Sequence, residues 1–153
     1  MTERARLVLS DAKEAAEELP HGFSDPGDES TIRRRYVAVM ALLRAVGNVL
    51  NEVDGEQGPA HLQEAIAEQW RQPKPPIWDF IDGSRAAVLK RYEHPDLDFD
   101  LIMGSDYADL FIDFSGADEI SVNGLVEMAI RFWEDHLDAV DRLAEKYRQC
   151  ADD

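Results

Sequence analysis

The sequence predicts an all-α protein: a bundle of four or five helices with a small acidic β-hairpin or extended insertion before the last long helix. Two observations support this prediction. Apolar residues recur at helical spacing through most of the chain, and turn residues separate the periodic stretches. Only residues 96–115 change to a period of two. The length of 153 residues suits one domain with its own core, so we assign residues 1–153 to a single domain.

The first four helices are defined by apolar stripes and by the residues that end them. Pro20 ends the first helix, "DGEQG" ends the second, and Pro59 is well placed in the first turn of the third. "RQPKPP" is a stiff break before the fourth helix, which ends at His94-Pro95. We therefore expect helices at residues 3–19, 31–54, 59–72 and 76–93.

Residues 96–119 are interpreted as an acidic insertion. "DLDFDLIM" alternates aspartates with apolar residues, and "DLFIDF" does so less regularly on the other side of "GSDYA". This period predicts a hairpin or two extended arms, followed by a loop at "SGADE". The last helix, at about 121–150, carries an apolar stripe that includes Trp133 and His136.

The net charge is −16, and it is unevenly distributed. Residues 92–130 contain ten Asp and Glu residues and no Lys or Arg. A field of this sign opposes binding to nucleic acid, so RNA is a disfavoured partner. It suits a basic protein partner, but the simpler explanation is that the charge keeps the protein soluble.

Features of membrane, secreted and metal-binding proteins are missing from the sequence. "MTERARLVLS" is too polar for a signal peptide, and no apolar run approaches the ~18 residues of a membrane span. The single cysteine, Cys150, forms no internal disulfide. "DLDFDLIMGSDY" has Leu101 and Tyr107 where a calcium loop has glycine and glutamate. We expect a cytoplasmic protein that needs no metal or cofactor.

The stretch "RFWEDH" contains an arginine and a histidine five positions apart. Five residues turn a helix by about 140°, so Arg131 and His136 should face different ways. His136 lies in the apolar stripe and is predicted to point inward, whereas Arg131 is predicted to be a surface residue. His136 is either a core histidine with a hydrogen-bond partner or a general base that lines a pocket.

Two further charges fall on apolar helix faces. Arg44 is the only charged residue in "YVAVMALLRAVGNVL", and Arg85 lies in the stripe of the fourth helix. A buried guanidinium needs a carboxylate or a phosphate. Each arginine is therefore either part of an internal salt bridge or, together with Asn48 and His136, part of an anion site. Trp78 and Trp133 lie in the same stripes and are candidate binding residues.

The pattern "RRRYVAVMALLRAVGNVLNEVD" followed by "IWDFIDGSRAAVLKRYE", over about residues 31–93, resembles a group of small bacterial helical proteins that are similar to the HEPN superfamily. The resemblance implies a helical bundle that often dimerises. It also implies a setting in toxin–antitoxin or defence systems, where many members cleave RNA without metal through an arginine and a histidine. Arg85 resembles the motif arginine, but Ala86 replaces the usual polar residue and His94 is nine positions away. Arg131 and His136 have the motif spacing, but Phe132 again replaces the polar residue.

Three functions remain open from the sequence. The first is a HEPN-like interaction module of a toxin–antitoxin or defence-type system, in which the nuclease motif is degenerate. The second is an active metal-independent ribonuclease that uses His136 with Arg85 or Arg44. The third is an acidic neutralising protein: an antitoxin, an immunity protein or a nucleic-acid mimic. We also expect a homodimer, because Leu125, Phe132 and Leu137 widen the apolar face of the last helix.

Overall fold

A computed structural model of the chain describes residues 1–19, 29–82, 111–114 and 118–152, without the side chains of 29, 30, 32, 33, 111–122 and 152. These residues form α1 (Glu3–Glu17), α2 (Glu29–Val49), the π-helix η1 (Leu50–Gly55), α3 (Ala60–Arg71) and α6 (Val122–Asp152). Residues 77–82 form a further helical segment. The predicted all-α bundle is confirmed, and the bounds of the other four helices agree with the expected ones to within a few residues. The predicted end of the helix expected at 76–93 lies outside the described residues.

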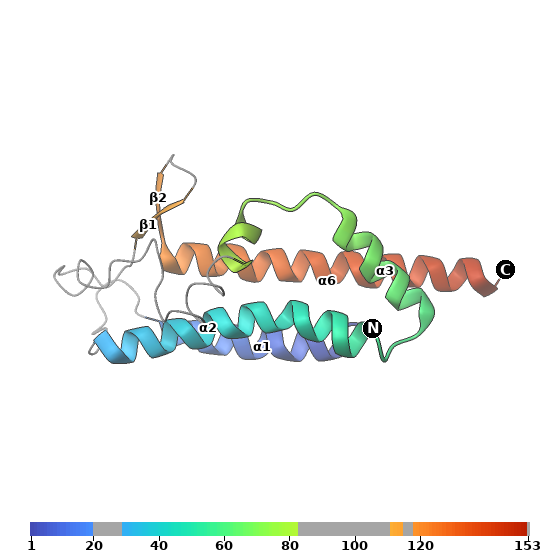
Figure 1. The fold of residues 1–153 in the computed structure, drawn as a ribbon, viewed down its shortest axis with the longest axis horizontal. Helices are drawn as coiled ribbons and strands as arrows, with labels where there is room; N and C mark the ends of the chain where they lie inside the picture. The colour runs from blue at the N-terminus through green and yellow to red at the C-terminus, as the bar shows by residue number, and fades with distance from the viewer. Residues whose placement is uncertain (20–28, 83–110, 115–117, 153) are drawn as a thin grey trace.

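The long helix α6 is the element on which the others are assembled (Figure 1). α1 and α2 lie antiparallel along one side of it, and both contact α6. α3 packs on the C-terminal half of α6, and residues 77–82 lie over its N-terminal half. Residues 72–76 arch between these two segments, so α6 meets two different neighbours on this side.

The core is built from the apolar stripes that the sequence predicts. On α2 the side chains of Tyr36, Val39 and Leu43 are at most 1% exposed. On α6 the side chains of Ala129, Trp133 and Val140 are fully buried. Complete burial of a large apolar side chain stabilises a fold by about 1.5–3 kcal/mol. These two stripes therefore supply much of the free energy that holds α1 and α2 against α6.

Residues 34–55 are long and apolar enough, by length and composition alone, to cross a membrane. Such a segment was not expected from the sequence. Its inward face is buried in the core of the bundle, with Met40, Val46 and Leu50 at most 1% exposed. Burial on one face therefore accounts for its apolar composition, and the cytoplasmic location stays a prediction.

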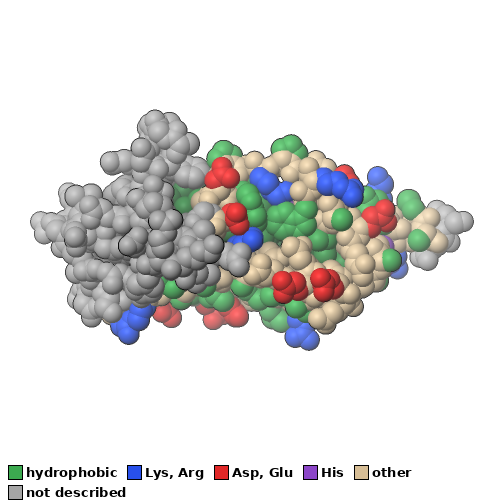
Figure 2. Space-filling model, in the orientation of Figure 1, with side chains coloured by type: hydrophobic (Ala, Val, Ile, Leu, Met, Phe, Trp, Pro, Cys, Tyr) green, Lys and Arg blue, Asp and Glu red, His purple; other side chains and the backbone are tan. Residues whose placement is uncertain are grey.

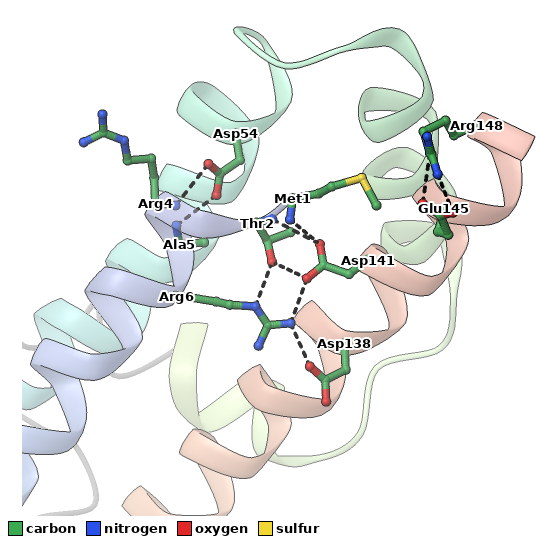
Figure 3. Close-up of polar contacts among 10 residues, drawn as sticks. All are labelled: Met1, Thr2, Arg4, Ala5, Arg6, Asp54, Asp138, Asp141, Glu145 and Arg148. Atoms are coloured by element: carbon green, nitrogen blue, oxygen red, sulfur yellow. Dashed lines mark hydrogen bonds and ion pairs between the residues drawn. The ribbon is translucent and has the colours of Figure 1, made fainter.

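A polar junction of Thr2, Arg6, Asp138 and Asp141 ties the N-terminus of the chain to α6 (Figure 3). Thr2 donates hydrogen bonds from its backbone N–H and its hydroxyl to Asp141, both at 3.0 Å. The Arg6 guanidinium donates to Asp138 at 2.7 Å and to Asp141 at 2.8 Å. The start of α1 is therefore fixed beside the C-terminal half of α6.

The carboxylate of Asp54, in η1, provides the cap that α1 lacks locally. It accepts hydrogen bonds from the backbone N–H groups of Arg4 at 3.2 Å and Ala5 at 2.9 Å. The first N–H groups of a helix have no partner inside it, and a carboxylate there is also favoured by the helix dipole. The switch of helix type at Leu50, which was not predicted, occurs in the segment that presents Asp54 to α1.

The two described strands, β1 (Phe111–Phe114) and β2 (Asp118–Ser121), pair antiparallel, with Ile112 opposite Ile120. A short hairpin before α6 is therefore present, but it is displaced along the chain from the prediction. Period two across 96–115 suggested pairing around "GSDYA", whereas β2 includes residues that were assigned to the "SGADE" loop. The first predicted arm, 96–103, lies outside the described residues.

The broad apolar face of α6 is covered within the chain itself. Leu125 and Leu137, which suggested a dimer, are fully buried in the single chain, and Phe132 is partly buried. The neighbours of α6 on both sides provide this cover. The homodimer stays a prediction, without the uncovered face on which it was based.

Candidate functional site

Five rings form one continuous aromatic cluster where α3 and residues 77–82 meet α6. Trp70, from α3, contacts Trp78 with ring centroids 5.2 Å apart and His136 with centroids 4.7 Å apart. Two rings of α6 also contact Trp78. The ring centroid of Trp133 lies 5.8 Å from that of Trp78, and the centroid of Phe132 lies 5.6 Å from that of Trp78. Edge-to-face and tilted rings at these distances attract one another beyond the area they bury. The cluster thus contains all three tryptophans of the chain.

A cleft of about 380 Å³ lies against this cluster. Its walls are the end of α3, the segment 72–75, Ile77 and one face of α6. The apolar part includes Ile77, Met128 and Phe132, and the charged part consists of Lys74, Arg131 and Asp135, with His136 beside them. In Figure 2, apolar side chains reach the surface between residues 77–82 and α3, with Lys and Arg side chains near them.

His136 is the buried polar residue of the cleft. It is 4% exposed, and its Nε2 has no hydrogen-bond partner among the described residues. Burial, with a smaller contribution from the charge of Lys74, lowers the pKa of His136 to about 4. The imidazole is therefore neutral at physiological pH. It is buried as predicted, but the hydrogen-bond partner expected of a core histidine is missing from the described part of the chain.

Lys74 was not predicted as a site residue. Its Nζ donates to the backbone carbonyls of Trp70 at 2.8 Å and Gln72 at 3.0 Å, and lies 4.8 Å from the centre of the Trp70 ring. Burial lowers the pKa of Lys74. No carboxylate lies within ion-pair distance of it in the described part of the chain. The sequence signal was the "PKP" in the stiff break, but nothing in it indicated that the ammonium would lie near His136.

Arg44 lies on the other side of the aromatic cluster. Its guanidinium lies 3.3 Å from Asp82 and is stacked 5.3 Å from the centre of the Trp78 ring. The internal salt bridge that the sequence left open is therefore formed. Asn48 is half-buried one turn further on. The candidate binding residues Trp78 and Trp133 stand between Arg44 and His136.

A tight contact holds Trp133 in place. A Cβ atom at Gly47 would lie 2.9 Å from Cη2 of Trp133, and Nη1 of Arg44 lies 3.6 Å from the same position. Glycine at this position of α2 therefore lets the Trp133 ring approach the backbone. The indole Nε1 of Trp133 has no hydrogen-bond partner among the described residues.

Of the predicted site residues, the structure describes Arg44, Asn48 and His136, and Arg44 and His136 contact different rings of the aromatic cluster. Arg44 and His136 are separated by the tryptophan rings, and Arg85 and His94 lie outside the described residues. Arg131 is exposed, as predicted, but it borders the same cleft as His136. Arg131 and His136 therefore face different ways, as predicted, and both still border one cleft. The cleft lies over Met128, Phe132 and Asp135 on α6. Arg131 and His136 are at the two edges of this face of the helix, so both border the cleft.

Among the described residues, no group of three His, Cys, Asp or Glu side chains could hold a metal ion. The row of carboxylates that a nucleic-acid mimic requires falls mainly within 83–110, outside the described residues.

The chain is a small all-α bundle protein with a cleft beside a largely buried aromatic cluster on its long last helix. No family model, curated protein or solved structure matches the chain. The HEPN-like resemblance therefore stays a prediction, and the function has to be argued from the site itself.

Proposed function

We propose that this protein is a HEPN-like interaction module of a bacterial toxin–antitoxin or defence-type system, and that it acts by binding rather than by cutting RNA. One observation carries the proposal. The two candidate catalytic residues that the structure describes, Arg44 and His136, are held apart by Trp78 and Trp133. Metal-independent phosphodiester cleavage requires the base and the phosphate-binding cation to reach one phosphate together.

The charges of the two residues support the same proposal. The guanidinium of Arg44 already has Asp82 as its partner. The pKa of His136, lowered to about 4, is well below the value near neutrality that suits a general base. A residue with this pKa accepts a proton weakly at physiological pH. Both groups are therefore poorly prepared for catalysis.

The net charge of −16 suits the partner that we propose, a protein with a basic surface. Charge of one sign over a surface steers an oppositely charged partner and makes association fast and sensitive to salt. The same charge disfavours RNA. An acidic bundle that binds a basic protein accounts for the charge and for the separated site residues together.

The catalytic alternative is tested by incubating the purified protein with a mixed RNA pool in a chelator. His136→Phe removes the candidate base, Arg131→Gln removes the motif arginine, and Arg142→Gln is a control at an exposed site of α6 outside the cleft. We expect no cleavage by any of the four proteins. Cleavage by the wild type and by Arg142→Gln that is lost in His136→Phe would overturn the proposal in favour of a ribonuclease.

The binding part is tested by co-expressing the chain with the products of adjacent genes and measuring masses by light scattering. We expect one product with a basic surface to form a complex that weakens as salt is raised. The same measurement on the chain alone reports whether it is a homodimer. Elution of the chain apart from every neighbouring gene product would contradict a two-gene interaction module.

A further inference from the structure

The cleft beside the aromatic cluster has an unusual charge balance for so acidic a protein. Two cations, Lys74 and Arg131, border it, and neither has an ion-pair partner among the described residues. Asp135 is four residues from Arg131 on the same helix, a spacing at which such pairs often meet. No ion pair joins them here, so both cations can interact with a ligand.

His136 is the second, independent observation. A buried polar group without a hydrogen bond is costly to a fold, and such groups are usually satisfied. This imidazole is 4% exposed, lines the cleft, and lacks a partner for Nε2 within the described residues. Among the described residues, a side chain that lines the cleft therefore leaves one buried nitrogen unsatisfied.

We propose that this cleft binds a small organic monocarboxylate with an apolar body. The carboxylate would lie near Arg131 and Lys74, and the apolar body would pack on Met128 and Phe132. The proposal concerns this cleft alone and does not depend on the partner protein proposed above.

The residues that line the cleft indicate the class of ligand that fits it. Ile77, Met128, Phe132 and the prolines of 72–75 form an apolar surface, which a free inorganic anion would not use. Binding pockets for small molecules are typically apolar, with a few placed polar groups, and begin at about 300 Å³. The volume of about 380 Å³ therefore suits a compact ligand with an apolar body.

The charged groups that border the cleft favour a ligand with one negative charge over a ligand with two. Two cations and one carboxylate border the cleft, and the neutral His136 adds no charge at physiological pH. The carboxylate of Asp135 also lines the cleft, so it repels a second negative charge on a ligand bound there. A monocarboxylate is therefore favoured over a phosphate dianion, and the two cations disfavour an organic amine.

The test measures binding of 3-phenylpropionate to the purified full chain by titration calorimetry and tryptophan fluorescence. All three tryptophans are in the aromatic cluster beside the cleft, so a ligand bound in the cleft should change their fluorescence emission. The uncharged 3-phenylpropionamide and inorganic phosphate are the comparison probes. We expect the amide to bind about tenfold more weakly than the acid, because it loses the charge-assisted hydrogen bonds. Phosphate should bind more weakly still.

Three exposed positions on α6 make the test specific without disturbing the core. Arg131→Gln should weaken binding of the acid about tenfold, and Arg142→Gln, its matched control, should leave it unchanged. Asp135→Asn should strengthen it about threefold, because a repulsive charge is removed. Circular dichroism melts would verify that all three variants fold.

Four results would overturn the proposal. They are no binding of the acid, equal binding of acid and amide, binding of phosphate as tight as that of the acid, and equal loss in Arg131→Gln and Arg142→Gln. None of these results bears on RNA cleavage or on complex formation, so a failure here is distinguishable from a failure of the proposed function.

Discussion

Polar groups on neighbouring turns of α6 differ in whether they have hydrogen-bond partners. At the polar junction, Asp141 accepts from Thr2 and Arg6, and every charged group there has a partner. About one to two turns earlier, in the aromatic cluster, Nε2 of His136 and Nε1 of Trp133 have no hydrogen-bond partner among the described residues. Both regions are partly or wholly buried, so burial alone does not explain the difference.

The contrast separates a structural region from a candidate binding region. At the junction, burial alone would raise the pKa of Asp141, but hydrogen bonds from Arg6 and Thr2 and the charge of the N-terminus hold it below its usual value. In the cluster, burial lowers the pKa of His136 with no compensating partner. Completed polar groups position α1, whereas buried nitrogens of the cluster are left without a partner among the described residues.

The largest effect is expected from removing the centre of the aromatic cluster. Trp133 is fully buried and contacts the rings of Trp70, Trp78 and Phe132. Trp133→Ala should lower the free energy of unfolding by about 3–5 kcal/mol. Urea denaturation followed by circular dichroism measures the loss. A change below about 1 kcal/mol would show that the cluster is not part of the core.

His136 should make stability depend on pH in a defined window. The unfolded chain binds this proton with a pKa of 6.5, and the folded protein binds it only near 4. The unfolded state therefore takes up the proton first as the pH falls. Above pH 6.5 the neutral His136 costs the folded state nothing. As the pH falls to 4, the free energy of unfolding decreases by about 3 kcal/mol.

The matched variant for this pH effect is His136→Phe, which keeps a ring in the cluster. Its unfolding free energy should fall less steeply than that of the wild type between pH 6.5 and pH 4. The charged groups near the imidazole, Lys74, Arg131 and Asp135, and the more distant Asp141 are common to both proteins. Identical slopes in the two proteins would contradict the lowered pKa.

At the polar junction, Asp141→Asn should destabilise the fold by about 2 kcal/mol, because Arg6, Thr2 and the N-terminus lose a partly buried partner. Asp138→Asn is the matched control. Its side chain is 55% exposed and accepts from the same guanidinium, so its loss should stay below about 1 kcal/mol. Equal losses at the two positions, measured by urea denaturation, would remove the structural role assigned to Asp141.

The smallest effect is expected from Gly47→Ala. Alanine favours a helix over glycine by up to about 1 kcal/mol, but its Cβ would lie 2.9 Å from the Trp133 ring. We expect a net loss of about 1 kcal/mol. In a Trp133→Phe background, which removes the contacting ring atoms, the same substitution should stabilise the protein. A stabilising Gly47→Ala in the wild-type background would show that the ring moves freely.

The sequence by itself determined the helices, because the apolar spacing and the turn residues are local properties of the chain. The apolar stripes of α2 and α6 were expected from the spacing, and their members Tyr36, Val39, Trp133 and Val140 are buried. The inward position of His136 followed from the same spacing. Helix ends and the hairpin were predicted less closely, since their bounds depend on partners elsewhere in the chain.

Only the tertiary structure decided which side chains meet. The pairing of Arg44 with Asp82, the capping of α1 by Asp54 and the approach of Lys74 to His136 join residues from different elements. Spacing along one helix places a residue on a face but does not say which neighbour covers that face. The separation of Arg44 from His136 by tryptophan rings is likewise a property of packing. The spacing in "RFWEDH" predicted that Arg131 and His136 face different ways, and only packing showed that both border one cleft.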